Sequence, residues 1–441
     1  MLTAVVGVNW GDEGKGRMVD LLSSDYDVIA RYQGGNNAGH TVVNEKGRFI
    51  LNLLPSGILR DGAVNVMGPG MVVDLEHLVG EIDGLRASGI KITPENLKIS
   101  DKATVCLPYH RLLDCLEEDR LKDKKFGSTR RGIAPVYGDK YMKKTVRMGD
   151  ILTPAALKER LFSLVEWKNL LLEGYKPLFR TAEWNALFVA NGYASGTIEP
   201  ETVFDRVMKY GGSLKEFITD TGAYLDNALK LKKNVMFEAQ LGALRDIDFG
   251  IFPYTSSSST IAAYAPSGAG IPRAKLDGVI GIVKAYSSCV GEGPFVVEMS
   301  GLEADMLREA GGEYGAATGR PRRVGAFDAV ASSYGVKIQG ATALALTKLD
   351  VLSYMEKIPV CTAYEVDGER CSEFMTDERL LRAKPVIEYM DGFKRDISKC
   401  RKKSDLPANA LKYIEYAEKT LGTGIKYVSV GQAREDFVLM Y

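Results

Sequence analysis

The sequence predicts an α/β protein with a large, mostly parallel central sheet that is flanked by helices. Short runs of β-branched and apolar residues recur along the 441-residue chain, and runs of this kind form buried parallel strands. Helical patterns alternate with these runs, and this alternation is the order that builds a parallel sheet. The expected strands cover residues 3–8, 27–32, 64–67, 234–238, 279–283, 343–347 and 425–430.

The first expected strand leads into a glycine-rich loop and then a helical pattern, a unit related to that of the P-loop NTPases. Loop 11–17 reads Gly-Asp-Glu-Gly-Lys-Gly-Arg. Its glycines let backbone N–H groups approach an anion, and the following helix adds the positive end of its dipole. We therefore expect the loop to bind nucleotide phosphates, with Lys15 along the bridging oxygens. The alternative is a tight turn with solvated charges.

The loop departs from the Walker A pattern GxxxxGK[ST] at one functional position. Gly16 stands where that pattern has the hydroxyl that binds magnesium. A carboxylate can replace the hydroxyl, because it can bind Mg²⁺ directly or act as a general base. The candidates are the two acids of the loop, Asp12 and Glu13.

A second glycine-rich loop, residues 32–41, holds one of the three histidines of the chain. A histidine in a loop, taken alone, is more often structural than catalytic. The presence of the first glycine-rich loop reverses this preference and favours a catalytic role for His40. His77 and His110 lie on helical patterns, and we expect them to be structural.

Two further regions have helical patterns. Residues 74–88 are expected to form a helix, with Asp74 as its N-cap and Gly89 at its C-terminal end. Residues 153–233 contain several helical patterns without strands. We expect a helical insertion here, within a single domain of residues 1–441, that serves as scaffold or dimer surface.

Composition excludes several classes of protein. Lys and Arg number 57 and Asp and Glu number 57, so no net charge points to a nucleic-acid partner. The six cysteines form no CxxC pair, which argues against zinc and fits free thiols in a reducing cytoplasm. The first residues are typical of a strand rather than a signal peptide, and no apolar run reaches the roughly 18 residues of a membrane span. We expect a cytoplasmic protein without a membrane partner.

The two glycine-rich loops, at 9–17 and 31–41, closely resemble those of adenylosuccinate synthetases. The resemblance continues at 53–59, 246–248, 315–323 and 346–352. It implies a GTP-dependent carbon–nitrogen ligase of purine biosynthesis, which joins IMP and L-aspartate through 6-phosphoryl-IMP and releases GDP and phosphate. It also implies one or two Mg²⁺ ions, and a homodimer in which Lys143 reaches the IMP phosphate of the neighbouring subunit.

The resemblance assigns roles to individual residues. Asp12 matches the general base and magnesium ligand, His40 the general acid, and Lys15 the phosphate-binding lysine, while the carbonyl of Gly39 completes the magnesium shell. The residues matched to GTP contacts are Gly11, Glu13, Gly14, Gly16, Arg17, Gly39, Thr41, Lys348, Asp350, Ser429 and Gly431. Those matched to IMP are Asn37, Thr129, Lys143, Gln240, Ser256 and Arg320, and those matched to aspartate are Thr318, Arg320, Arg322 and Arg131.

Charge and hydrogen-bonding patterns agree with two of these assignments. Arg320 and Arg322 lie on a glycine-containing loop, and two arginines suit a dicarboxylate. Lys348 and Asp350 follow an expected strand in the order TKLD, similar to the NKxD of GTPases. An aspartate that accepts from the N1–H and N2–H groups of guanine explains a preference for GTP over ATP.

The departures from the family pattern gather in the nucleotide pocket. Arg130 and Ala134 replace glycines, and Lys143 replaces an arginine, which keeps the charge and loses the bidentate fork. Segment 238–242 reads EAQLG instead of EGAQG, so Gln240 and Leu241 are out of the family register. Serine and alanine replace threonines at Ser256 and Ala317.

These departures leave three other functions open. The chain could be a related synthetase that acts on another purine monophosphate such as dGMP, although the retained Asp12 favours IMP. It could be a GTP-binding regulator without ligase activity, but His40 and the two-arginine loop have no purpose there. It could also be a catalytically degenerate paralogue.

Overall fold

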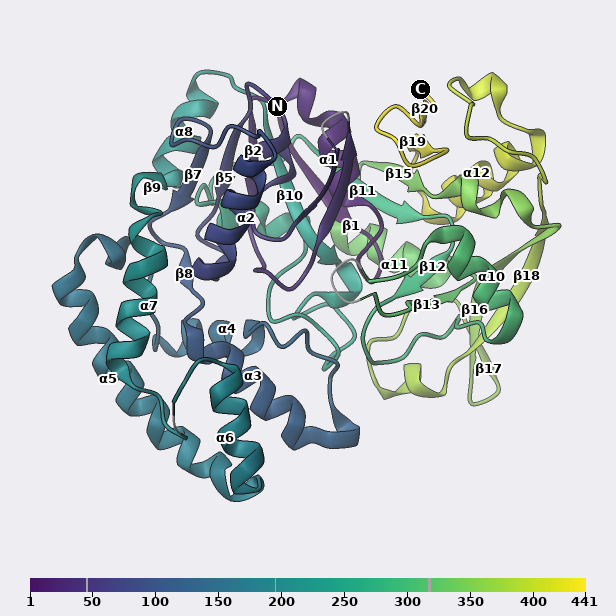
Figure 1. The fold of residues 1–441 in the computed structure, drawn as a ribbon. Helices are drawn as coiled ribbons and strands as arrows, with labels where there is room; N and C mark the ends of the chain where they lie inside the picture. Colours follow the sequence, from purple (N-terminus) through teal and green to yellow (C-terminus); the bar gives the residue numbers. More distant parts are fainter. Residues whose placement is uncertain (45–46, 195, 316–318) are drawn as a thin grey trace.

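Ten strands form the central sheet of the computed structural model, which describes residues 1–44, 47–194, 196–315 and 319–441 (Figure 1). Neighbouring strands in this sheet are parallel, except the edge pair β19 and β20. The predicted fold class is therefore confirmed. Across the sheet the strands are β20 (Phe437–Leu439), β19 (Ile425–Ser429), β15 (Ala343–Thr347), β11 (Gly278–Lys284), β1 (Leu2–Gly7), β10 (Val235–Gly242), β2 (Val28–Arg31), β5 (Val64–Met67), β7 (Leu97–Ser100) and β9 (Ile218–Thr219).

The seven predicted strands are all present. Those expected at 64–67 and 343–347 coincide with β5 and β15, and the others differ only at their ends. The largest difference is in β10, which continues to Gly242. Smaller sheets accompany the central one. They comprise β3 (His40–Asn44) with β4 (Gly47–Leu51), β6 (Val72–Val73) with β8 (Thr104–Val105), β12 (Ser287–Cys289) with β13 (Arg323–Gly325), and β14 (Phe327–Asp328), β16 (Lys357–Val366), β17 (Glu369–Cys371) and β18 (Lys384–Asp391).

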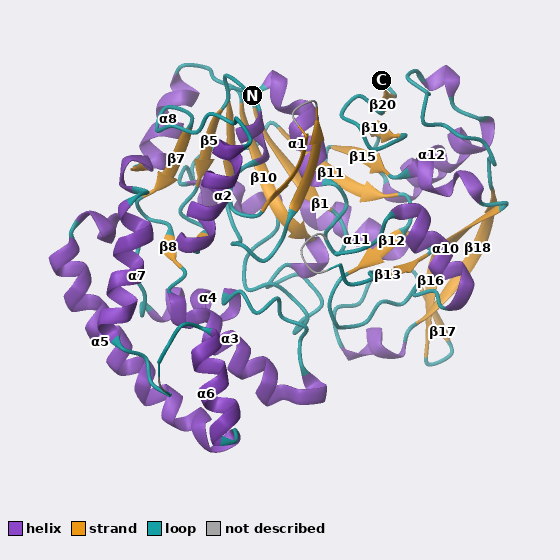
Figure 2. Cartoon of the chain, in the orientation of Figure 1, coloured by secondary structure: helices purple, strands orange, loops and turns teal. Residues whose placement is uncertain are grey.

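Helices flank the sheet and also form a lobe at one end of it, seen at the lower left of Figure 2. One apolar cluster runs from Leu97 and Ile99 of the sheet to Leu112 and Leu161 of the lobe, so the two parts share a core. In the described part of the chain, no helix is long and apolar enough to cross a bilayer. The helices are α1 (Lys15–Leu22), α2 (Leu75–Ala87), α3 (Pro108–Leu121), α4 (Ile133–Met142), α5 (Pro154–Tyr175), α6 (Thr181–Ala190), α7 (Pro200–Gly212), α8 (Thr221–Lys230), α9 (Ala265–Ala269), α10 (Gly301–Gly311), α11 (Ala329–Gln339) and α12 (Ala408–Leu421).

The region expected to be helical, 153–233, contains α5 to α8 as predicted, but the expectation that it lacks strands is wrong. β9 comes from this region and adds to the sheet beside β7, pairing Ile218 with Ile99. A strand of two residues has no alternation of its own, so its sequence carries no strand signal. The helix expected at 74–88 is α2, and Asp74 caps it by accepting from the backbone N–H of His77 at 3.1 Å.

The position of β1 determines where the site lies. β1 is near the middle of the sheet, between β10 and β11, and all six of its residues are buried. The loop expected to bind phosphates follows its carboxyl end directly. In open parallel sheets, ligands bind at the carboxyl ends of the strands, so this arrangement places the loop where a binding site is expected.

A buried carboxyl group at the start of α11 makes stability depend on pH. Asp328 is fully buried, and it accepts from the backbone N–H of Ala331 at 2.9 Å and from the Tyr364 hydroxyl at 2.7 Å. Burial raises the pKa of Asp328 to about 6. The folded protein therefore holds this proton more tightly than the unfolded chain, whose pKa is about 4. The contribution to stability is present below about pH 4 and is lost as the pH rises through about 6.

We predict that Asp328→Asn raises the melting temperature relative to wild type at pH 7.5 and changes it less at pH 4.5. The amide imitates the protonated carboxyl and keeps the cap on Ala331. Scanning calorimetry of both proteins at the two pH values measures this difference. A difference in melting temperature that is the same at both pH values contradicts the assignment.

Candidate active site

Close packing of the backbone explains the glycines of the phosphate loop. Gly14 caps α1 with a φ of 98°, and Gly11 has a φ of 103°, a region that favours glycine. A Cβ atom added to Gly16 would lie 2.7 Å from the Cβ atom of His40. The two glycine-rich loops are thus in contact, which brings His40 to the start of α1.

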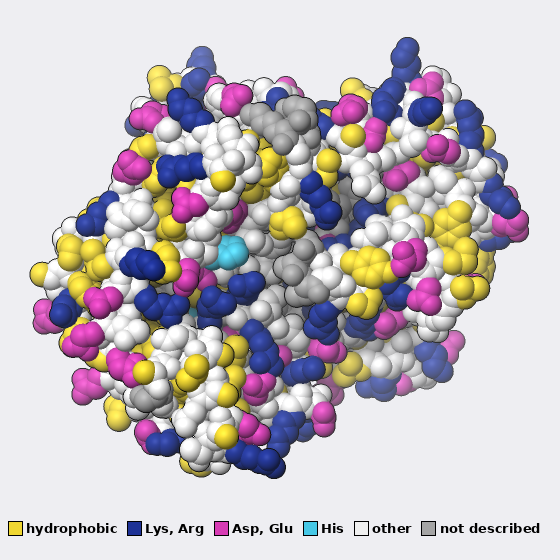
Figure 3. All heavy atoms as spheres, viewed as in Figure 1, with side chains coloured by type: hydrophobic (Ala, Val, Ile, Leu, Met, Phe, Trp, Pro, Cys, Tyr) yellow, Lys and Arg dark blue, Asp and Glu magenta, His cyan; other side chains and the backbone are white. Residues whose placement is uncertain are grey.

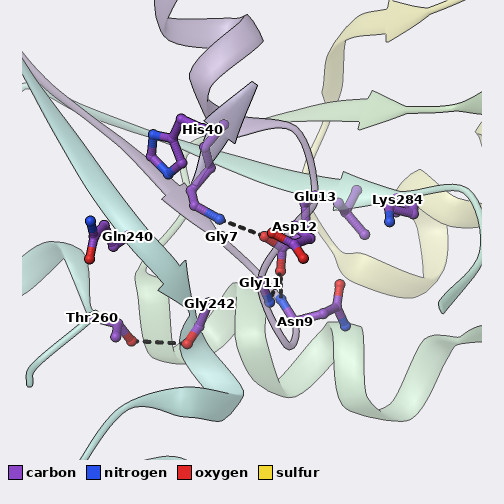
Figure 4. A network of polar contacts seen from close by, with 12 residues as sticks. Gly7, Asn9, Gly11, Asp12, Glu13, His40, Gln240, Gly242, Thr260 and Lys284 are labelled. Atoms are coloured by element: carbon purple, nitrogen blue, oxygen red, sulfur yellow. Dashed lines mark hydrogen bonds and ion pairs between the residues drawn. The ribbon is translucent and has the colours of Figure 1, made fainter. Parts of the chain in front are cut away.

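The two acids of the phosphate loop differ in direction. Glu13 is buried, and its Oε1 accepts from the backbone N–H groups of Asn9 at 3.0 Å and Gly11 at 2.8 Å (Figure 4). Its Oε2 lies 2.7 Å from the Nζ atom of Lys15. Asp12 has a positive φ of 60°, and its side chain is one-third exposed. Asp12 is therefore the acid that can reach a substrate, whereas Glu13 braces the loop from inside.

His40 is held by a carboxylate that the sequence did not indicate as a site residue. Its Nδ1 lies 2.5 Å from Oε1 of the fully buried Glu238 on β10. The backbone N–H and the hydroxyl of Ser56 both donate to Glu238 at 2.7 Å. Burial lowers the pKa of His40, although Glu238 acts in the opposite direction. The Nε2 atom has no hydrogen-bond partner among the described residues, so it is the nitrogen that can meet a ligand.

Arg322 links the loop expected to bind aspartate to the phosphate loop. One of its terminal nitrogens lies 3.1 Å from Oδ2 of Asp12, and the other donates to Glu313 at 2.9 Å. Arg320 is exposed two residues earlier in the chain. Ala317 and Thr318 lie outside the described residues. The structure therefore brings the predicted base and one predicted aspartate ligand into contact.

The expected guanine site lies beyond the carboxyl end of β15. Lys348 has a positive φ of 60°, and the Oδ1 atom of Asp350 is buried without a hydrogen-bond partner among the described residues. Burial raises the pKa of Asp350. Arg17 donates to the hydroxyl of Ser429 at 2.8 Å and to the carbonyl of Gly431. Arg17 thus holds the second predicted guanine segment, and its contacts are with this segment rather than with the phosphate loop.

The expected IMP loop joins α3 to α4. Thr129 is exposed and Arg131 is partly buried. Arg130 has a positive φ of 55°, so the replaced glycine stood at a position that favours glycine. Ala134 is exposed in the first turn of α4, and Lys143 is exposed at its C-terminal end.

Gln240 and Leu241, where β10 departs from the family pattern, point in opposite directions. Gln240 is fully buried, and its amide donates to the carbonyls of Gly35 at 2.7 Å and Asn52 at 2.9 Å. Leu241 has a positive φ of 59°, and a Cβ atom added to Gly11 would lie 3.6 Å from its Cδ2 atom. The amide therefore faces the second glycine-rich loop, and the leucine faces the phosphate loop.

The remaining predicted residues surround these groups. Asn37 accepts from the backbone N–H of Gly35 at 3.3 Å, and Ser256 lies 3.2 Å from Ser258, hydroxyl to hydroxyl. Gly39 and Thr41 flank His40 where β3 begins. Figure 3 shows a hollow bordered by Lys and Arg side chains near the centre of the face that it draws. Positive charge around a hollow favours an anionic ligand.

The residues present fit a magnesium ion. The described residues contain no cluster of three or more His, Cys, Asp or Glu side chains that could enclose a metal ion. Mg²⁺ needs no such cluster, because it commonly takes one or two protein oxygens and completes its shell with phosphate and water. The partly exposed carboxylate of Asp12 and the carbonyl of Gly39 are oxygen donors of this kind.

Fold and site together define a class of protein. A glycine-rich anion loop lies at the carboxyl end of a central parallel strand. A carboxylate that can reach a substrate and a buried histidine accompany it. This is an α/β nucleotide-binding enzyme with acid–base groups at its phosphate loop.

Sequence comparisons identify the family. The family model that matches residues 4–438 is that of adenylosuccinate synthetase. The adenylosuccinate synthetase of Caldanaerobacter subterraneus subsp. tengcongensis is 41% identical over 440 residues, which cover 100% of this chain and 99% of that protein. The one from Streptococcus gordonii is 41% identical over 432 residues, covering 98% and 96%. The chain belongs to the adenylosuccinate synthetase family, whose members are GTP-dependent ligases that join IMP and L-aspartate.

Comparisons with solved structures agree with this family assignment. The fully ligated adenylosuccinate synthetase from Plasmodium falciparum is similar with a TM-score of 0.88 and 34% identity, over 100% of this chain and 99% of that one. The succinoaminodeoxyadenylate synthetase of cyanophage S-2L, bound to dGMP and dATP, is similar with a TM-score of 0.57 and 18% identity, over 99% and 95%. The second similarity shows a shared fold alone.

Proposed function

We propose that this chain forms adenylosuccinate in two steps and that Asp12 starts the first step. Asp12 removes the N1 proton of IMP, and O6 of IMP then attacks the γ-phosphate of GTP, which breaks the bond to the β–γ bridging oxygen and releases GDP. The amino group of L-aspartate next displaces phosphate from 6-phosphoryl-IMP. Activation is needed because a purine oxo group is a poor leaving group and phosphate is a good one. The observation that supports the proposal is the contact between Asp12 and Arg322 at 3.1 Å, because it joins the residue proposed as base to the one proposed to bind aspartate.

The phosphate loop and His40 support the phosphoryl transfer. The backbone N–H groups of loop 11–17 and the Lys15 ammonium group bind the phosphates of GTP. His40 directs its Nε2 toward the transferred group, because Glu238 holds its Nδ1. Negative charge that develops on the transferred phosphoryl group favours a protonated His40, which then donates a hydrogen bond.

Arg322 and Arg320 bind the carboxylates of L-aspartate in this proposal, and we assign Thr318 to the same substrate from the sequence. We assign the recognition of the guanine base to Asp350. Its buried Oδ1 atom has no partner among the described residues and can accept from the N1–H or N2–H groups. Adenine presents an acceptor in place of the N1–H, which explains the use of GTP. We assign IMP contacts to Asn37, Thr129, Gln240 and Ser256. The amide nitrogen of Gln240 is engaged, whereas its Oε1 atom has no hydrogen-bond partner among the described residues.

Asp12 and the Gly39 carbonyl hold Mg²⁺ in this proposal. The ion, when bound, reduces the negative charge that opposes attack on the γ-phosphate. Asp12 then has two tasks, because it is also the base. Its position at the outer side of the loop, with one-third of its side chain exposed, suits both.

The chain acts as a cytoplasmic homodimer in this proposal, with Lys143 placed across the interface. Two exposed large side chains, Tyr141 and Met142, precede Lys143 and offer an apolar contact. The six cysteines are free thiols, as expected for a reducing compartment. Sedimentation of the purified protein, with and without IMP, measures the oligomeric state.

One assay tests the function. Purified protein is mixed with GTP, Mg²⁺, IMP and L-aspartate, and adenylosuccinate is followed by ultraviolet absorbance. Product that requires all three substrates supports the proposal. Product with dGMP and none with IMP contradicts it, as does GTP hydrolysis that does not depend on aspartate. An absence of product with either monophosphate, in protein that binds GTP, indicates a degenerate enzyme.

A further inference from the structure

A fully buried carboxylate, that of Glu313, lies among three cations from separate parts of the chain. Its Oε1 atom is 2.8 Å from the Nζ atom of Lys284 and 3.9 Å from that of Lys348, and its Oε2 accepts from Arg322 at 2.9 Å. The hydroxyl of Tyr286 also donates to Oε1, at 2.5 Å. A carboxylate with this many partners fixes their positions relative to one another.

The partners of Glu313 belong to two binding regions. Lys284 ends β11 and pairs in register with Thr347 of β15, directly before Lys348. Lys348 also donates to the carbonyl of Gly311, at the end of α10. Arg322 donates its backbone N–H to the carbonyl of Glu313 at 2.9 Å, which closes the loop between them. Glu313 therefore ties the loop assigned to aspartate to the carboxyl end of β15, where Lys348 is assigned to GTP.

The charges of this group come from three cations and three carboxylates. Lys284, Arg322 and Lys348 carry the positive charges, and Glu313, Asp12 and Asp350 are the carboxylates near them. Lys284 and Arg322 are mostly buried, so water screens their charges only weakly. Loss of the Glu313 charge would therefore leave two buried cations without their nearest carboxylate.

We propose that Glu313 is a positioning residue for both GTP and L-aspartate. It holds Arg322 toward the carboxylates of aspartate and Lys348 toward the nucleotide, so the affinities of both substrates depend on this one carboxylate. The proposal rests on the aspartate role of Arg322 and the GTP role of Lys348 given above. A purely structural role for Glu313 would instead affect all three substrates alike.

The test is Glu313→Gln, which keeps the shape of the side chain and removes its charge. We expect the KM values for aspartate and GTP to rise about tenfold or more, and the KM for IMP to stay within about twofold. Glu298→Gln is the matched control, because it removes an exposed carboxylate that pairs with Arg323 at the start of β13. The control should leave all three KM values within about twofold of wild type.

A second variant covers the case in which Glu313→Gln does not fold. Tyr286→Phe removes one hydroxyl donor to Glu313, and we expect the KM values for aspartate and GTP to rise about threefold with folding intact. Circular dichroism checks the fold of each variant. Unchanged KM values for aspartate and GTP in the folded variants overturn the proposal. An equal rise of the KM values for all three substrates also overturns the proposal. A rise of the KM for only GTP or only L-aspartate overturns it as well.

Two further measurements separate this proposal from the assigned function. If wild type makes no adenylosuccinate, the function fails, and calorimetric titration with GTP and with L-aspartate still decides the role of Glu313. If Arg322→Leu raises the KM for aspartate and the Glu313 variants do not, the aspartate site stands and the inference about Glu313 is wrong.

Discussion

Asp12→Asn is expected to lower the turnover number by about a thousandfold, because the amide cannot take the N1 proton of IMP. GTP binding should stay within about threefold of wild type. The backbone N–H groups of the loop and the Lys15 ammonium group bind phosphate in this proposal, and neither is removed. The asparagine also keeps a side-chain oxygen that can face Mg²⁺. Steady-state assays of adenylosuccinate formation measure the turnover number, and titration with a fluorescent GTP analogue measures the affinity.

The control for this variant is Asp25→Asn. Asp25 is an exposed acid in the turn that follows α1, and the proposed chemistry does not use it. Asp25→Asn should leave both the turnover number and the affinity for GTP unchanged. Turnover of Asp12→Asn near the wild-type value would remove Asp12 from the role of base.

His40→Asn should reduce the turnover number by a factor of about a hundred to a thousand, the usual loss when one preorganised donor to a transition state is removed. The loss should appear in the turnover number more than in the KM values. His40 is assigned to the charge that develops during transfer, and this charge is absent from the bound substrates.

His77→Asn is the matched control for this second variant. His77 lies on α2, and its Nε2 lies 3.0 Å from the side-chain carbonyl oxygen of Asn52. This variant therefore tests the loss of a histidine outside the proposed chemistry. The result that would reassign His40 is a rise in the KM for GTP with an unchanged turnover number. That pattern belongs to a residue that only binds.

Strands with clear local signals could be predicted from the sequence. β5 ends at Met67 because Gly68, Pro69 and Gly70 follow, and such residues stop a strand. β9 could not be predicted, because a pair of residues at a sheet edge becomes a strand only through its neighbour β7. Local patterns thus identify the long elements, and tertiary contacts decide the short ones.

Some residues of the site could likewise be predicted from the sequence, and others could not. The glycine pattern of loop 11–17 indicates an anion loop, but adjacent acids cannot be told apart by spacing. The positive φ of Asp12 and the inward hydrogen bonds of Glu13 separate them. Glu238 and Glu313 were missed because each is a lone acid in the sequence, and only the fold brings its partners to it. A buried acid within an apolar strand is the one signal that could have indicated Glu238.

The pair formed by Glu13 and Lys15 has a consequence for which anions the enzyme can hold. The ammonium group of Lys15 lies 2.7 Å from a carboxylate, so an incoming anion must compete with that carboxylate for it. A single inorganic phosphate offers few contacts to win this competition. In the proposed site, a nucleoside triphosphate also contacts the backbone amides and the guanine segments, and it binds because the free energies of these contacts add. Inorganic phosphate, which the reaction itself releases, should therefore be a weak inhibitor of the enzyme.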